Sequence, residues 1–186
     1  MDLTMQWGTN PAVKNLALGN WDLAKYICPM TIKLLAIGKT DSPELQTLIA
    51  DYSNRLGYYI PFSVEIIPDI KNTKSFTEAQ QKEKEGGLIL KKIRSSDVLV
   101  LLDERGKQYS SLDFSAYLQK QMNSGLKQLV FVIGGPYGFS KAVQQKAQGM
   151  ISLSKMTFSH QMVRLFFVEQ LYRACTILKN EPYHHQ

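Results

Sequence analysis

Apolar and polar residues alternate along the chain in a way that predicts strands and helices in turn from Thr31 onward. The predicted strands are short apolar runs, at Ile32–Ile37, Phe62–Ile67, Val98–Leu102, Gln128–Ile133 and Met150–Leu153. The predicted helices are longer amphipathic segments, at Ser42–Gly57, Ser75–Ile93, Leu112–Met122, Ser140–Gly149 and His160–Leu178. Strands separated by helices are typical of an α/β fold with a mainly parallel sheet covered by helices on both faces.

Local signals support the ends of several elements. Ser42 is a typical N-cap residue, Pro43 suits the first helical position and Gly57 closes the predicted helix. The last helix, His160–Leu178, is apolar on more than one stripe. This pattern predicts burial on the sheet and against a second chain, most simply in a two-fold homodimer. A central helix in a single core is the alternative.

Residues 1–29 have a mixed composition without a clear period, and they precede the first clear strand. We interpret them as an N-terminal extension, either an upstream start or an appendage. The rest of the chain, residues 30–186, suits one domain of ordinary size.

The chain is basic, with 22 Lys and Arg against 16 Asp and Glu, a formal charge of +6 and a pI near 9.2. An anionic partner is therefore expected, nucleic acid foremost, although a basic enzyme without such a partner has the same balance. Residues 71–94 hold seven basic and three acidic side chains, a net of +4. Their interleaving favours a solvated helix face over a surface that contacts phosphate.

The two cysteines, Cys28 and Cys175, lie far apart in the sequence and predict neither a disulfide framework nor a metal cluster. A reducing, cytoplasmic location fits this usage. No apolar run is long enough to cross a bilayer, and the first residues lack the features of a signal peptide. We therefore expect a protein that is neither secreted nor inserted in a membrane.

Several common site motifs are excluded. Gly38–Thr40 resembles the end of a P-loop, but Lys33 stands where that loop needs a glycine. A dinucleotide-binding turn would need three spaced glycines after the same strand, and only Gly38 is present. The three histidines, His160, His184 and His185, lack zinc-ligand spacing, and no nucleophile-elbow sequence supports Ser/His/Asp catalysis.

Three segments remain that each follow a predicted strand: Leu101–Gly106, Ile133–Gly138 and Leu153–His160. Parallel strands end at the same edge of a sheet, so these segments are expected to meet where ligands usually bind. Gly134 and Gly135 can take positive φ and expose bare backbone, although a tight connection would use the same residues. The irregular third segment could read an adenine ring with backbone groups and apolar side chains, or it could be an ordinary loop.

Three stretches, IGGPYGFS, LSKMTFSHQMVRLFFVEQLYRA and the terminal NEPYHHQ, together closely resemble the ribosomal large-subunit methyltransferase H family of the SPOUT superfamily. The resemblance runs from about Met30 to Gln186. It implies an α/β knot, with a trefoil knot in the C-terminal part, and a homodimer without a metal. It also implies a cytoplasmic enzyme that uses S-adenosylmethionine to methylate N3 of a pseudouridine in 23S ribosomal RNA, with either the free RNA or the assembled ribosome as its partner.

The resemblance also implies site residues. The cofactor contacts it suggests are Leu102, Gly134, Ser154, Lys155, Met156, Thr157, Phe158 and Ser159. His184 is the candidate general base or orienting group, because it titrates near neutrality, and Tyr183 could stack on the target base. Positions in the last helix that match the family, for contact with ligand or for packing, are His160, Arg164, Glu169, Tyr172 and Arg173.

One position departs from the family, where many members carry Arg or Lys and this chain has His185. A permanent cation is thereby replaced by a group that is only partly charged near neutrality, which weakens the case for a direct electrostatic role. Two other functions remain open. One is a catalytically silent module that binds RNA or the ribosome, and the other is a SPOUT methyltransferase that acts on transfer RNA.

Overall fold

The computed structural model describes residues 30–71 and 75–184. The proposed extension at 1–29 and the departure at His185 lie outside the described residues. In chain order the elements are β1 (Thr31–Ile37), α2 (Pro43–Leu56), β2 (Phe62–Ile67), α3 (Glu78–Leu90), β3 (Val98–Gln108), α4 (Ser111–Asn123), β4 (Gln128–Ile133), α5 (Lys141–Lys146), β5 (Gly149–Ser152) and α6 (His160–Leu178).

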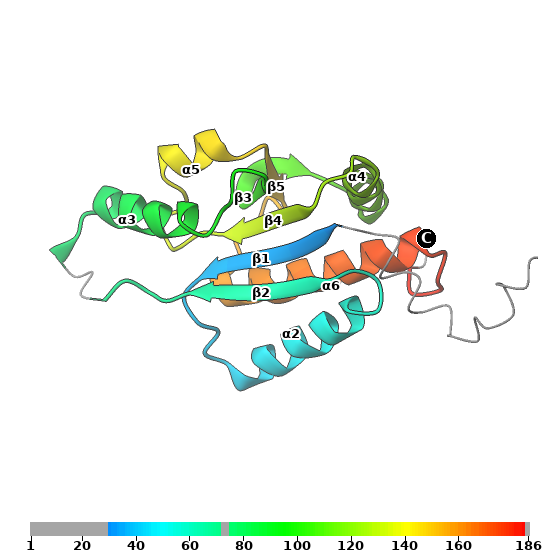
Figure 1. Ribbon diagram of the computed structural model, residues 1–186. Coiled ribbons are helices and arrows are strands. Elements are labelled where there is room, and N and C mark those ends of the chain that lie inside the picture. The colour runs from blue at the N-terminus through cyan, green and yellow to red at the C-terminus, as the bar shows by residue number, and fades with distance from the viewer. Residues whose placement is uncertain (1–29, 72–74, 185–186) are drawn as a thin grey trace, which may run out of the picture.

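The strands form one sheet in the order β2-β1-β4-β3-β5, and every pairing is parallel. Helices cover both faces, so the predicted α/β fold is confirmed (Figure 1). Helices α2, α4 and α6 pack on one face, and α3 and α5 pack on the other. The trefoil knot stays a prediction.

Coverage on both faces explains the composition of the central strands. In β1, Ile32, Leu34 and Ala36 enter the core beneath α6, while Leu35 and Ile37 enter the core beneath α3. Successive side chains of a strand point to opposite faces, so a strand covered twice needs apolar residues at consecutive positions. The apolar runs of β1, β3 and β4 are therefore central strands, whereas β2 and β5 form the edges of the sheet.

Side-chain caps set the starts of the helices. The Ser42 hydroxyl accepts a hydrogen bond from the Leu45 amide at 3.2 Å, as the N-cap prediction requires. The long polar helix was predicted from Ser75, but α3 begins at Glu78 because Thr77 and Gln80 form a reciprocal capping box. Helix α2 ends at Gly57 in a right-handed conformation, so this glycine is not required by its φ.

Strand β3 departs most from its prediction, because it continues to Gln108 instead of ending at Leu102. Leu102 and Lys107 both align with Ile151 of β5, so residues 103–106 bulge out of the ladder between them. A Cβ on Gly106 would lie 2.6 Å from the Ile151 backbone, which only glycine avoids. The bulge places charged residues at the carboxyl edge of the sheet.

None of the helices in the described part of the chain combines the length and the apolar character needed to cross a membrane.

Candidate functional site

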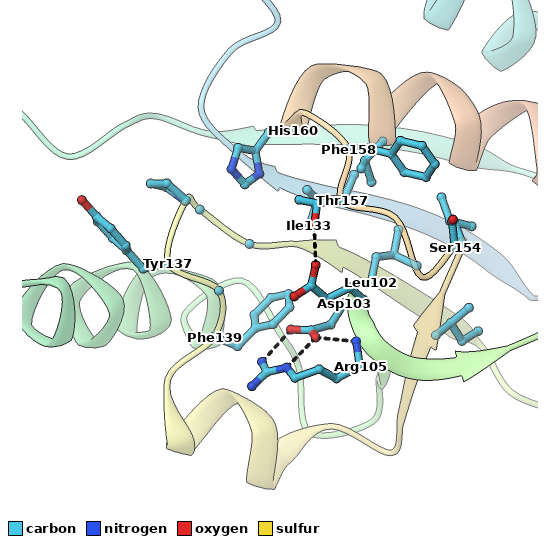
Figure 2. Close-up of a pocket in the computed structure, with 18 of the residues that line it drawn as sticks. Leu102, Asp103, Arg105, Ile133, Tyr137, Phe139, Ser154, Thr157, Phe158 and His160 are labelled. Atoms are coloured by element: carbon cyan, nitrogen blue, oxygen red, sulfur yellow. Dashed lines mark hydrogen bonds and ion pairs between the residues drawn. The ribbon is translucent and has the colours of Figure 1, made fainter.

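A cavity of about 440 Å³ opens at the carboxyl ends of β3, β4 and β5 (Figure 2). Its walls come from the three segments that the sequence placed at one edge, after Leu101, Ile133 and Leu153. The prediction that these segments meet is thus confirmed. The apolar part of the wall consists of Leu102, Ile133, Ile151, Leu153, Phe158 and Val163.

The glycine-rich turn after β4 forms one wall, but its glycines act differently from the expectation. Positive φ occurs at Gly138, at +80°, and not at Gly134 or Gly135. The first two glycines are needed for space. A Cβ on Gly134 would lie 3.1 Å from the Phe139 ring, and one on Gly135 would lie 2.2 Å from a carboxylate oxygen of Glu85. Backbone is therefore packed closely on both sides of the turn.

The loop between β5 and α6 forms the opposite wall and is stabilised by its own serines. The Ser152 hydroxyl donates to the Ser154 carbonyl at 2.7 Å, and the Ser154 hydroxyl accepts from the Met156 amide at 3.0 Å. Among the expected cofactor contacts, those that line the cavity are Leu102, Gly134, Ser154, Met156, Thr157 and Phe158. Lys155 and Ser159 do not line it, and the Ser159 side chain caps α6.

The bulge of β3 supplies three charged residues that received no role from the sequence. Asp103 and Arg105 form a bidentate ion pair, with Nε–Oδ1 at 2.8 Å and Nη2–Oδ2 at 2.9 Å (Figure 2). Arg105 lowers the pKa of Asp103, against the opposing effect of burial. Glu104 accepts a hydrogen bond from the Thr157 hydroxyl at 2.8 Å. In the sequence, these three residues are visible as a charged triplet directly after a buried strand. Their place at the cavity follows only from the pairing of β3 with β5.

At the start of α6, His160 lines the cavity and Arg164 lies behind it. Partial burial and the nearby Arg164 guanidinium lower the pKa of His160, so its ring is neutral at pH 7. Arg164 is only 2% exposed and donates to the Ile37 carbonyl at 2.7 Å and to the Thr40 hydroxyl at 2.8 Å. Arg164 therefore joins α6 to the end of β1 and does not reach the cavity.

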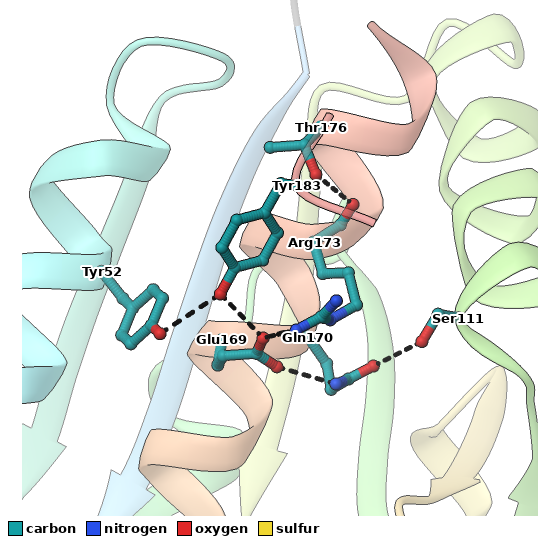
Figure 3. A network of polar contacts seen from close by, with 7 residues as sticks. All are labelled: Tyr52, Ser111, Glu169, Gln170, Arg173, Thr176 and Tyr183. Atoms are coloured by element: carbon teal, nitrogen blue, oxygen red, sulfur yellow. Dashed lines mark hydrogen bonds and ion pairs between the residues drawn. The ribbon is translucent and has the colours of Figure 1, made fainter. Parts of the chain in front are cut away.

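The C-terminal tail folds back on the other half of α6 (Figure 3). The Tyr183 hydroxyl contacts the Tyr52 hydroxyl at 3.3 Å and donates to Glu169 at 3.1 Å, and Glu169 also pairs with Arg173 at 2.5 Å. Burial, followed by the hydrogen bonds with Tyr52 and Glu169, raises the pKa of Tyr183. In the adjacent His184, Nδ1 is buried and has no hydrogen-bond partner among the described residues.

The tail contacts the middle of α6, whereas the cavity lies at its start. Glu169, which holds Tyr183, follows the last cavity residue of α6, Val163, by six residues, a rise of about 9 Å. Tyr183 and His184 do not line the cavity of their own chain. Within one chain, six of the eight predicted cofactor residues therefore line the cavity, and the predicted catalytic residues stand apart from them.

Two further predictions concern a metal site and the basic stretch at 71–94. Within residues 30–71 and 75–184, no three His, Cys, Asp or Glu side chains lie close enough together to bind a metal ion. In the basic stretch at 71–94, Lys84 packs over the Phe76 ring at 3.4 Å and Lys92 pairs with Glu65 at 2.8 Å. These partners favour the solvated helix face over a phosphate-binding surface.

Comparison with known proteins places these features in a family. The profile described as "Predicted SPOUT methyltransferase" matches residues 30–184. The chain is 69% identical to ribosomal RNA large subunit methyltransferase H of Flavobacterium johnsoniae and 70% identical to that of Flavobacterium psychrophilum. Each alignment covers 157 residues, 84% of this chain and all of the relative.

A solved structure is more distantly similar. It is the SpoU methyltransferase AviRb from Streptomyces viridochromogenes in complex with AdoMet, with a TM-score of 0.42 and 14% sequence identity. The match covers 81% of this chain and 59% of that chain.

Proposed function

The chain belongs to the SPOUT methyltransferase family, in the group of ribosomal RNA large subunit methyltransferase H, and from this membership we propose the reaction and the roles of its residues. The proposed reaction is methylation of ribosomal RNA of the large subunit, at N3 of a pseudouridine, with S-adenosylmethionine as the methyl donor. The observation that carries the proposal is the cavity in which three strand-end segments meet. A bacterial ribosomal substrate places the enzyme in the cytoplasm.

The residues around the cavity suit this donor. Its volume of about 440 Å³ falls within the usual range for small-molecule sites, and its wall combines apolar side chains with the glycine turn. Leu102, Leu153 and Phe158 would enclose the adenine ring, and backbone groups of the loop after β5 would read its polar edge. When bound, S-adenosylmethionine supplies a methyl group attached to a positively charged sulfur.

The protein's part in this reaction is mainly positioning. Methyl transfer to nitrogen needs an in-line approach, so walls that hold the reacting groups near contact distance can supply much of the acceleration. The target N3 carries a proton, and a general base that removes it contributes about 10²- to 10⁴-fold. In the cavity wall, the His160 ring is neutral at pH 7. Asp103 and Arg105 hold each other in place through two hydrogen bonds.

We assign the role of base or orienting group to His184, with Tyr183 as the side chain that stacks on the target base. Neither lines the cavity of its own chain, and Glu169, which holds Tyr183, lies about 9 Å along α6 from the cavity residue Val163. We therefore propose that a second copy brings its tail to the cavity, which makes a homodimer part of the proposal. The outer surface of α6, with Phe166 37% exposed, offers an apolar face for such contact.

Three measurements test the proposed function. Calorimetry should detect S-adenosylmethionine binding at one site per chain, and transfer of labelled methyl should be observed on large ribosomal subunits. A protein that binds RNA without binding the donor would be a silent module, and labelled transfer RNA instead of ribosomal RNA would assign another SPOUT substrate. Mass spectrometry of ribosomal RNA from a deletion strain should show one methyl group fewer on a pseudouridine.

A further inference from the structure

The cavity wall carries an unbalanced negative charge. The acidic and basic side chains that line the cavity are Asp103, Glu104, Arg105 and His160. Asp103 is neutralised by Arg105 through two hydrogen bonds, and His160 is neutral at pH 7. Glu104 instead contacts a neutral hydroxyl, that of Thr157. The formal charge of the wall is therefore −1, in a chain whose net charge is +6.

The fold holds Glu104 at this place from two sides. The bulge begins and ends on the same β5 residue, since Leu102 and Lys107 both align with Ile151. Close packing of Gly106 against the Ile151 backbone brings β3 back to β5 directly after the bulge. The hydrogen bond from Thr157, 53 positions further along the chain, comes from the opposite wall and is the dashed line below Thr157 in Figure 2.

We propose that Glu104 makes the cavity prefer the positively charged methyl donor over its product, which has lost that charge. The inference rests on the proposed function, because it takes the cavity as the donor site. In the reaction the bond between carbon and sulfur breaks, and its electron pair stays on sulfur. The N3 lone pair forms the new bond to carbon, and the N3 proton leaves to a base. The positive sulfonium becomes a neutral thioether.

This loss of charge has a direct consequence for binding. A carboxylate near the ligand attracts the donor more strongly than the product by one unit of charge. Glu104 is solvent-exposed, so water and salt reduce the attraction to a moderate size. Asp103 cannot serve in the same way, because both of its oxygens are bonded to Arg105. After transfer, the weaker attraction favours exchange of product for fresh donor.

The test compares dissociation constants for S-adenosylmethionine and S-adenosylhomocysteine by calorimetry. Glu104→Gln keeps the shape and the oxygen that accepts from Thr157, but it removes the charge. We expect about tenfold weaker donor binding and less than about twofold change for the product. Glu104→Asp keeps the charge and should retain most of the preference. Added salt should reduce the preference of the unaltered protein more than that of Glu104→Gln.

Glu83→Gln is the matched control, since it makes the same change of net charge on an exposed residue of α3 that does not line the cavity. It should leave both dissociation constants unchanged. Equal weakening of both ligands in Glu104→Gln, or an unchanged ratio, would overturn the role of Glu104. Failure of the unaltered protein to bind either ligand would instead overturn the proposed function, and the inference with it.

Discussion

At the scale of single residues, Gly134 is a position in the turn after β4 where a side chain would fit only if its neighbours shifted. A Cβ there would lie 3.1 Å and 3.2 Å from two atoms of the Phe139 ring, and 3.3 Å from the Gly138 carbonyl oxygen. All three residues line the cavity. The space that Gly134 leaves open therefore sets the position of the ring and the width of the proposed donor site.

Gly134→Ala should thus displace Phe139 and weaken S-adenosylmethionine binding about tenfold, as measured by calorimetry. Gly87→Ala is the control, because a Cβ on this helical glycine meets nothing within 4 Å. The control should bind normally and gain about 0.5–1 kcal/mol of stability from the better helix propensity of alanine. Unchanged donor affinity in Gly134→Ala would contradict the assignment of the cavity.

Glu85, behind the same turn, is a buried carboxyl group that is only 3% exposed. One of its oxygens accepts from Gln81 at 2.8 Å, while Oε2 has no hydrogen-bond partner among the described residues. Burial, with a smaller contribution from Asp69, raises the pKa of Glu85, against the opposing hydrogen bond from Gln81. The folded protein therefore holds this proton more tightly than the unfolded chain does.

A raised pKa in the folded state means that the carboxyl contributes most to stability at acidic pH, and that the contribution is lost as the pH rises through the folded pKa. Glu85→Gln cannot ionise, so it should be more stable than the unaltered protein at pH 7, by about 1 kcal/mol. The gain should vanish below about pH 4.5, the ordinary value. Urea unfolding at both pH values measures it, with Glu83→Gln as the exposed control. An equal effect at both pH values would refute this account.

At the scale of elements, Arg164 fixes the start of α6 against the end of β1. Its guanidinium is buried and donates to the Ile37 carbonyl and the Thr40 hydroxyl. Arg164→Met should cost about 1–3 kcal/mol, because the buried carbonyl loses a charged donor. The loss is measured by denaturant unfolding, with the exposed Lys179→Met as control. A cost no larger than that of the control would show that apolar packing alone positions α6.

The sequence predicted those elements whose signals are local. Strand β4 and helix α6 have the predicted bounds, because an apolar run before a glycine turn and a serine before a long apolar helix mark them. The predicted start of α3 at Ser75 is wrong by three residues, because the capping pair of Thr77 and Gln80 begins the helix at Glu78. In each case the deciding residues lie within a few positions of the boundary.

Features that depend on distant contacts could not be predicted in this way. The bulge of β3 exists only through its pairing with β5, more than 40 positions later. The position of Tyr183 depends on a chain reversal after α6, where Asn180 takes a φ of +55°. This reversal brings the tail back to Glu169 and away from the cavity. Local patterns therefore predicted which segments form the walls of the cavity. They did not predict the charged residues of the bulge in that wall, or the position of the tail.

At the scale of the whole molecule, the separation of tail and cavity would give the proposed dimer a function. Helix α6 carries the cavity residue His160 at one end and holds Tyr183 through Glu169 further along. A complete site would then combine the cavity of one copy with the tail of another. A two-fold arrangement forms two such sites from one kind of contact, because each copy gives a tail and receives one.

Mixing two inactive variants tests this arrangement. His184→Ala would leave the cavity intact, and Gly134→Ala would leave the tail intact, so each homodimer should transfer methyl groups poorly to ribosomes. In a mixed dimer with shared sites, one site holds both substitutions and the other holds none. Random exchange in equal amounts makes half of the dimers mixed, so activity should return to about a quarter of that of the unaltered enzyme. If each site were built within one chain, mixing would restore nothing, because every site would still carry one substitution.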